Sequence, residues 1–180
     1  MTATTLEHPG PLLPGAPRFR LDLPDGWHAA PAPRALAVAR PTVDVPGFQP
    51  NLTVTADLVP AGTTAAQVLD AMLAQYPGTR QPVPPADAST GDHAPGSDDA
   101  PDGDHAPDGT ARATLVRAHG TGTVHQRVDV HLDPTPVPGD HRHAVTVVSS
   151  WSATTPTDLR DALAAAHTSV RLGAADPAPA

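Results

Sequence analysis

Two histidines and a carboxylate alternate along one predicted strand, and their types and spacing could support chemistry. His125, Asp129 and His131 are separated by even numbers of positions, with Arg127 between them, so a strand would turn all of them to one face. Imidazole and carboxylate groups are ligands that Zn²⁺ and similar ions accept in proteins. The same alternation also predicts a solvated sheet face, or polar residues beneath a helix. We favour this second interpretation and expect no cofactor, with the metal site as the alternative.

Two aromatic residues in predicted loops are candidates for a partner-binding surface. Trp27 follows a Pro-Asp-Gly turn, and Phe48 follows Pro46 and Gly47. Large apolar side chains that gather on a surface commonly mark an interaction site. Trp151, in contrast, has periodic apolar neighbours in a predicted strand, and we expect it in the core. The sequence therefore predicts that any partner site lies around Trp27 and Phe48.

These residues need a scaffold, and its clearest part is a strand that leads directly into a helix. Apolar and polar residues alternate over 52–58, the pattern of a strand with one buried face. Thr64 and Gln67 then have the spacing of a capping box. Apolar residues over 65–76 recur at helical intervals until Pro77. Such a unit buries its apolar surface by laying the helix across a sheet that includes the strand.

Further strands and a second helix follow from the same kinds of pattern. We expect strands at 19–23, 36–38, 114–118, 124–132 and 145–151. The run Thr155-Pro156-Thr157-Asp158 indicates a helix start with a hydroxyl cap, a proline and an acid. Consecutive strands joined by turns predict an antiparallel sheet. The expected fold is therefore α+β, an antiparallel sheet of about six strands packed with two helices.

The predicted domain organisation is one folded unit with flexible attachments. Residues 1–17 indicate a flexible leader, 18–173 a single α+β domain, and 174–180 a flexible tail. The domain is interrupted at 81–111 by a low-complexity acidic insertion with seven aspartates and no arginine. After Val83 this insertion contains no apolar residue larger than alanine, so burial cannot offset its ordering entropy. We therefore expect 81–111 to be disordered.

Charge and composition exclude several classes of function. The formal net charge is −8, but apart from the seven aspartates of the insertion the acids (19 in all) nearly balance the 11 arginines. This balance predicts no binding to nucleic acid and no polybasic membrane contact. There are no cysteines and no run of about 20 apolar residues that could enter a bilayer. As written, the sequence predicts a cytoplasmic protein, or an envelope or secreted one if its native N-terminus lies further upstream.

Three short segments carry a resemblance to a known family. They are 23–27 (Leu-Pro-Asp-Gly-Trp), 50–55 (Pro-Asn-Leu-Thr-Val-Thr) with Leu58, and 151–153 (Trp-Ser-Ala). Together with the element order over roughly 18–173, they resemble the LpqN/LpqT family of actinobacterial lipoproteins and the wider PsbP-like fold. The resemblance implies an α/β/α sandwich without a recognised catalytic constellation, and roles in the cell envelope or in protein binding. Members typically carry a signal peptide and a lipobox cysteine, and this sequence has neither.

We therefore expect a non-catalytic protein that binds another protein, as an accessory in secretion or envelope biology. The alternative is a carrier that holds a small apolar ligand in a cavity between sheet and helix. An enzyme is the less favoured reading, since it needs a cleft in which His125, His131 or His143 meets a carboxylate. The sequence does not indicate an oligomeric state.

Overall fold

The computed structural model describes residues 14–75, 79–81, 109–120 and 122–173, with backbone only at 79–81. Most of the predicted leader (1–13), the predicted tail (174–180) and most of the predicted insertion (82–108) lie outside the described residues. The two ends of the predicted insertion lie in strands, because Gln81 closes one strand and Thr110 and Ala111 open the next.

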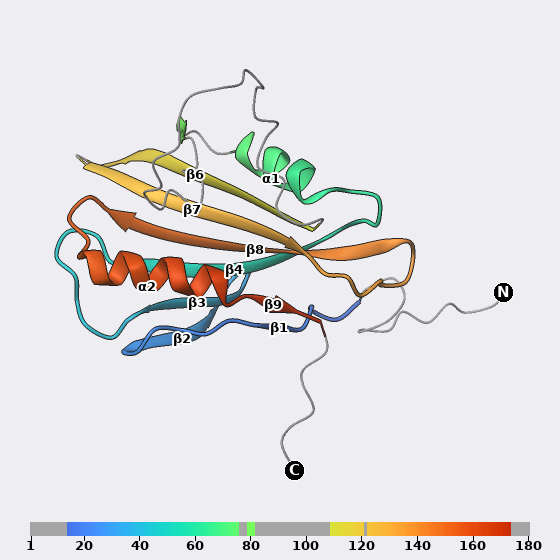
Figure 1. Ribbon diagram of the computed structural model, residues 1–180, viewed down its shortest axis with the longest axis horizontal. Helices are drawn as coiled ribbons and strands as arrows, with labels where there is room; N and C mark the ends of the chain where they lie inside the picture. Colours follow the sequence, from blue (N-terminus) through green and yellow to red (C-terminus); the bar gives the residue numbers. More distant parts are fainter. Residues whose placement is uncertain (1–13, 76–78, 82–108, 121, 174–180) are drawn as a thin grey trace, which may run out of the picture.

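Seven antiparallel strands form the main sheet, in the spatial order β2-β3-β4-β8-β7-β6-β5 (Figure 1). Their bounds are β2 (Trp27–Ala32), β3 (Ala35–Pro41), β4 (Asn51–Pro60), β5 (Thr79–Gln81), β6 (Thr110–His119), β7 (Gly122–Leu132) and β8 (His141–Ser152). Two short strands, β1 (Phe19–Arg20) and β9 (Arg171–Leu172), form a separate antiparallel pair. This pair brings the two ends of the described domain together.

The predicted α+β fold is confirmed, while its first strand is different. Of the strand expected at 19–23, only Phe19 and Arg20 form a strand, and they lie outside the main sheet. Trp27, which was placed in a predicted loop, instead opens the edge strand β2. Most of β2 is exposed and consists of small residues with Pro31 among them. Such a strand has no alternation to detect, and an edge is where proline is tolerated.

Two helices cover opposite faces of the sheet. Helix α1 (Ala65–Leu73) packs on β6 and β7, and α2 (Thr157–Thr168) lies over β8 and β4 on the other side (Figure 1). The predicted capping box of α1 is confirmed, because the Gln67 backbone N–H donates to Thr64 Oγ1 at 3.2 Å. The Thr64 backbone N–H in turn donates to Gln67 Oε1 at 2.8 Å. None of the helices in the described ranges is long and apolar enough to cross a membrane.

The start of α2 differs from the sequence prediction. The helix begins at Thr157 with Pro156 in the cap position, and no side chain caps its backbone N–H groups. Thr155, the predicted cap, instead accepts a hydrogen bond from the Ser152 backbone N–H at 3.0 Å. Thr155 is buried and tightens the turn that joins β8 to the helix. Its hydroxyl therefore stabilises the entry of the chain into α2 rather than the helix itself.

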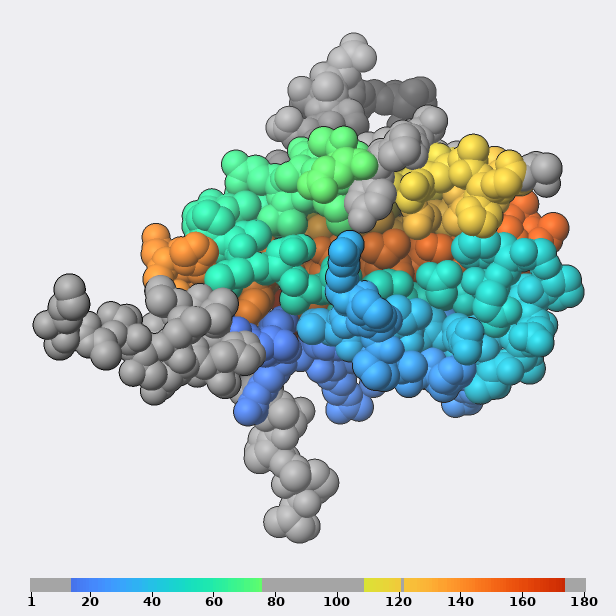
Figure 2. All heavy atoms as spheres, turned by 180° about the vertical axis from the view of Figure 1, so that it is seen from behind, coloured from blue at the N-terminus to red at the C-terminus, as the bar shows by residue number. Residues whose placement is uncertain are grey.

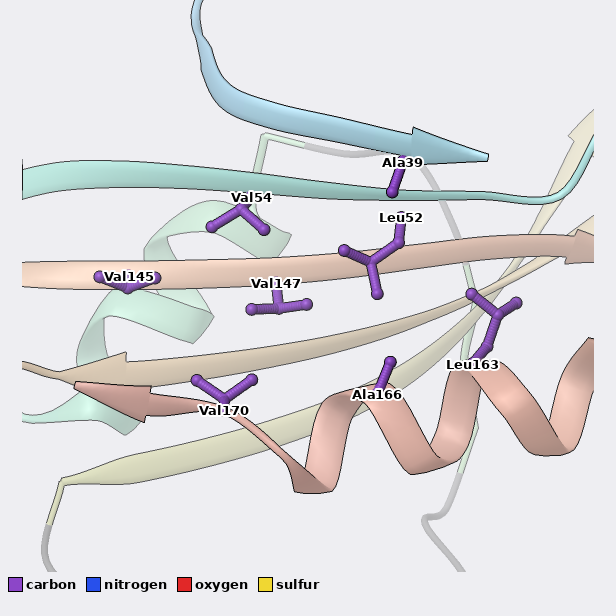
Figure 3. Close-up of a cluster of buried hydrophobic side chains, with 8 residues drawn as sticks. All are labelled: Ala39, Leu52, Val54, Val145, Val147, Leu163, Ala166 and Val170. Atoms are coloured by element: carbon purple, nitrogen blue, oxygen red, sulfur yellow. The ribbon is translucent and has the colours of Figure 1, made fainter. Parts of the chain in front are cut away.

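Apolar side chains on the two faces form two separate clusters. The α2-side core contains Leu163 and Ala166 of α2, which point toward Leu52 and Val147 of the sheet (Figure 3). The other members of this core are Ala39, Val54, Val145 and Val170. Across the sheet, Ala65 and Leu69 of α1 pack on β6, β7 and Ala144 of β8. Because Ala144 and Val145 are consecutive and point to opposite clusters, the sheet is the middle layer of an α/β/α sandwich.

Candidate functional site

Asp129 is the most unusual residue of the structure, because its side chain is charged and fully buried. Two arginines each contact it through two hydrogen bonds. Arg112 Nε and Nη2 donate to Asp129 Oδ1 and Oδ2, both at 3.0 Å. Arg127 Nε and Nη2 donate to the same two oxygens at 3.0 and 2.8 Å. This fork geometry makes each pair strong, and it offsets the cost of burying the carboxylate.

A histidine on α2 extends this ion pair into the helix layer. His167 Nδ1 lies 3.3 Å from Asp129 Oδ2, a contact without a well-aligned hydrogen bond. Its other ring nitrogen, Nε2, lies 2.9 Å from the hydroxyl of Ser149 on β8. His167 therefore joins α2 to two neighbouring strands of the sheet, β7 and β8. In the pairing of β7 with β8, Ser149 lies opposite Arg127.

The charges of this network follow from its burial and its contacts. Burial raises the pKa of Asp129, but the contacts of His167, Arg127 and Arg112 outweigh this effect and hold the pKa well below its ordinary value. Burial lowers the pKa of His167, and the neighbouring Asp129 offsets that change only in part. Near neutral pH the carboxylate is therefore charged and the imidazole is neutral. We assign the imidazole proton to Nδ1, toward Asp129, with Ser149 donating to Nε2.

Ser149, His167 and Asp129 are connected in the order of a hydrolytic triad. In such enzymes the serine hydroxyl contacts a histidine that a carboxylate orients, and the serine must reach a substrate. Here the exposed fractions of Ser149, His167 and Asp129 are 0%, 2% and 0%. The carboxylate is also occupied by two guanidinium groups. We conclude that the network links the helix to the sheet, because no substrate could contact Ser149 in this arrangement.

The structure does not group His125, Asp129 and His131, the three residues of the alternative metal site. His125 stacks on Trp151, with ring centroids 6.0 Å apart and planes inclined by 15°. His131 Nδ1 lies 3.5 Å from Thr110 Oγ1, and burial lowers the pKa of His131. No three His, Asp or Glu side chains in the described part of the chain are grouped to hold a metal ion. The interpretation that these are polar residues beneath a helix is correct for Asp129, because α2 covers it.

Sequence reasoning missed three members of the network, namely Arg112, Ser149 and His167. Only His167 had a usable signal, because it follows Leu163 by four positions and so lies on the apolar stripe of α2. A titratable residue on such a stripe needs a buried partner. Arg112 is opposite Asp129 in the β6–β7 register, and Ser149 is opposite Arg127 in the β7–β8 register. These pairings depend on register and cannot be found from alternation.

Trp27 and Phe48 lie in different surroundings. Trp27 is half-buried and packs against the α2-side core, which favours a packing role. Phe48 is half-buried and meets His119 edge-to-face, with ring centroids 5.6 Å apart. Phe48 lines a hollow of about 340 Å³ at one end of the sheet, together with Thr123 and Thr154. Phe48 therefore lies beside an open space.

A second hollow lies on the sheet face beside α1, and we call it the α1-side groove. Figure 2 shows this face, with β8 (orange) between α1 (green) and the blue segments of β2 and β3. The volume of the groove is about 260 Å³. Its lining residues come from four strands and α1, and they are Asn51, Thr53, Thr55, Met72, Leu115, Arg117, Gln126, Val128, Thr146, Val148 and Ser150. Hydroxyl and amide groups thus alternate with apolar side chains across an open surface.

Hydrogen bonds fix the polar groups of this groove. Gln126 Nε2 donates to Ser150 Oγ at 3.0 Å, and Arg117 Nη1 donates to Gln126 Oε1 at 3.3 Å. These bonds cross β6, β7 and β8 at the register that places Gln126 opposite Ser150. The side chain of Gln126 is therefore pre-positioned in the middle of the groove. A surface arranged in this way loses little side-chain entropy on binding.

Comparison with known proteins shows a shared fold. No protein-family model matches the sequence, and the search of curated proteins found no match. Among solved structures, the chain is similar to LpqN, which is involved in cell envelope biogenesis of Mycobacterium tuberculosis. The TM-score is 0.60 at 14% sequence identity, and the match covers 88% of this chain and 85% of LpqN. The resemblance inferred from the sequence is thus confirmed at the level of the fold.

Replacing Asp129 by Asn should lower the free energy of unfolding by about 3 kcal/mol, because the partly buried Arg112 and Arg127 would lose their shared counter-charge. The matched control is Asp22→Asn, which removes an exposed carboxylate 3.3 Å from Arg20 and should change stability little. Urea denaturation followed by circular dichroism measures both. Equal effects of the two substitutions would contradict the stabilising role of the buried network.

Stability should also fall as the pH is lowered below about 6.5, the ordinary pKa of histidine. The pKa of His167 is lowered in the folded state, so the unfolded chain binds more protons in this range. The stabilisation is therefore fully present above pH 6.5 and is lost as the pH falls toward the folded-state pKa.

His167→Gln should flatten this dependence between about pH 7 and 5, leaving the part that arises from His131, whose pKa is also lowered. His28→Gln, on the exposed strand β2, is the control and should keep the wild-type slope. Urea midpoints at each pH give the comparison. An unchanged slope in the His167 variant would show that this imidazole is not the responsible group.

Proposed function

We propose that this chain is a non-catalytic binding protein whose partner is another protein, and that the partner docks in the α1-side groove. One observation carries the proposal: the face that α1 leaves open is a shallow surface with ordered polar groups and apolar side chains between them. Mixed surfaces of this kind suit a polypeptide, since hydroxyl and amide groups pair with backbone N–H and C=O groups. The half-buried apolar members Met72 and Val148 supply area to bury.

The size of the groove favours a protein over an enclosed small ligand. Pockets that bury a small molecule usually have about 300–1,000 Å³ and surround most of its surface. The α1-side groove has about 260 Å³ and lies open on the sheet. One or two partner side chains would fill it, while the rest of the partner would rest on the surrounding surface. A carrier of a small apolar ligand remains the second candidate, because Met72, Leu115, Val128 and Val148 line the hollow between α1 and the sheet.

We further propose an accessory role in secretion or the cell envelope. LpqN, which has a similar fold, is involved in cell envelope biogenesis. At 14% sequence identity the similarity to LpqN supports a shared fold but not a shared activity. The partner and the compartment of this chain are therefore part of the proposal. Ser149 is fully buried and so is not accessible to a substrate, which supports a binding function over hydrolysis by this serine.

Site-specific crosslinking in the native host tests the docking site. A photoreactive benzoylphenylalanine in place of Thr53, which lines the groove, should give a discrete protein adduct. The same residue in place of Thr168, an exposed position on α2, should not. Adding Thr55→Trp, which fills the groove, should remove the Thr53 adduct, whereas Thr168→Trp should leave it.

The mass of the adduct separates the two candidate functions. An adduct of protein size that the filling substitution removes supports docking of a protein partner. An adduct of a few hundred daltons supports the carrier function instead. The same protein adducts from both positions, or none from Thr53, would contradict the proposal.

A further inference from the structure

The sheet face that carries α2 also has an open half, and its chemistry differs from that of the groove. Helix α2 lies over β8 and β4, so β6 and the outer side of β7 extend beyond it (Figure 1). Strand alternation and register bring Arg112 of β6 and Arg127 of β7 to this half, beside Asp129. Together with Arg160 of α2 and the stacked pair His125 and Trp151, they form what we call the basic strip.

The two strand arginines leave a surplus of positive charge. Asp129 is the one acid among the described β6 and β7 residues that alternate onto this face, and it is shared by both arginines. The side chain of Arg112 keeps 36% of its surface exposed, and that of Arg127 keeps 15%. Each guanidinium donates to Asp129 through Nε and Nη2. One edge of each arginine is therefore held toward the carboxylate. The two cations are thus rigidly positioned around a single buried anion.

Arg160 adds a third positive charge from the helix side. It precedes His167 by seven positions, which places it about 20° from His167 around α2. Because His167 faces Asp129, this spacing predicts that Arg160 borders the same open half of the sheet, with its Nη2 donating to Thr157 Oγ1 at 2.8 Å. The acids of this helix, Asp158 and Asp161, lie about 180° and 120° away from His167 and so face elsewhere. The described residues along the strip are therefore cationic, with an imidazole–indole stack on the same face.

We propose that the basic strip binds an acidic polypeptide segment of a partner protein. Carboxylates match the planar donors of arginine, and the exposed part of the Trp151 stack offers an apolar contact beside them. A nucleic acid is a poorer match, because its backbone needs cationic groups clustered along many phosphates, whereas the strip offers Arg112, Arg127 and Arg160. A short acidic segment carries few charges and needs only local complementarity. This surface and the α1-side groove lie on opposite faces, so each proposal can fail without the other.

Fluorescence anisotropy of the full chain with a labelled peptide tests the proposal. The probe is a synthetic twelve-residue peptide with a few Asp and Glu residues and one Phe among Gly and Ser, titrated at low and at moderate salt. Arg160→Glu should weaken binding by about ten-fold or more, the loss of roughly one charge-assisted hydrogen bond. The matched control is Arg40→Glu, an equal charge change at an exposed position on β3. Arg40 lies on the opposite sheet face by its register, and its substitution should change the affinity little.

A second readout locates the peptide on the molecule. In a Trp27→Phe chain, Trp151 is the remaining tryptophan, and its emission should change as the acidic peptide binds. Inorganic phosphate at equal ionic strength is the competitor, and sodium chloride is its control. The proposal is overturned if Arg160→Glu and Arg40→Glu weaken binding equally, if Trp151 does not respond, or if phosphate displaces the peptide more strongly than chloride. Absence of measurable peptide binding at low salt also overturns it.

Discussion

Two short helices must cover a wide sheet, and this mismatch determines which surfaces of the protein are open. Seven strands at about 4.8 Å spacing make a sheet nearly 30 Å wide, whereas one helix with its side chains is about 10–12 Å across. Among the described residues each face has one helix, α1 over β6 and β7, and α2 over β8 and β4. Neither helix of the described part of the chain therefore covers its whole face, and the parts beyond the helices carry the groove and the basic strip.

The hydrogen-bond partners of Asp129 explain how a buried carboxylate can lie beneath α2. A charge without partners would cost several kcal/mol at this depth. Arg112 and Arg127 provide four hydrogen bonds, and His167 connects the carboxylate to Ser149. The arrangement has the connectivity of a hydrolytic triad while it serves to fix a helix. The order of contacts alone is thus a poor guide to catalysis. The low exposed fractions of Ser149, His167 and Asp129 favour a structural role over a catalytic triad.

The sequence was a good guide to the elements with a strong local pattern, although the local cap prediction at Thr155 was wrong. Alternation over 52–58 identified β4, and Thr64 with Gln67 identified the start of α1, because both patterns are local. The strand β2 was missed, since an exposed edge of small residues has no buried face to produce a pattern. The partners of Asp129 were missed for a different reason. Arg112 and Ser149 join it through strand register, and His167 joins it through the docking of α2, which are properties of the whole fold.

Thiol labelling measures the uncovered faces most directly, because the chain has no cysteine of its own. Single cysteines at Thr53 in the groove, at Thr114 on the open half beyond α2, and at Val147 beneath α2 would report on the three environments. The structure predicts rapid reaction with a maleimide under native conditions at the first two positions, and at Val147 only after unfolding. Protection of Thr53→Cys or Thr114→Cys to the level of Val147→Cys would contradict the open faces on which both binding proposals depend.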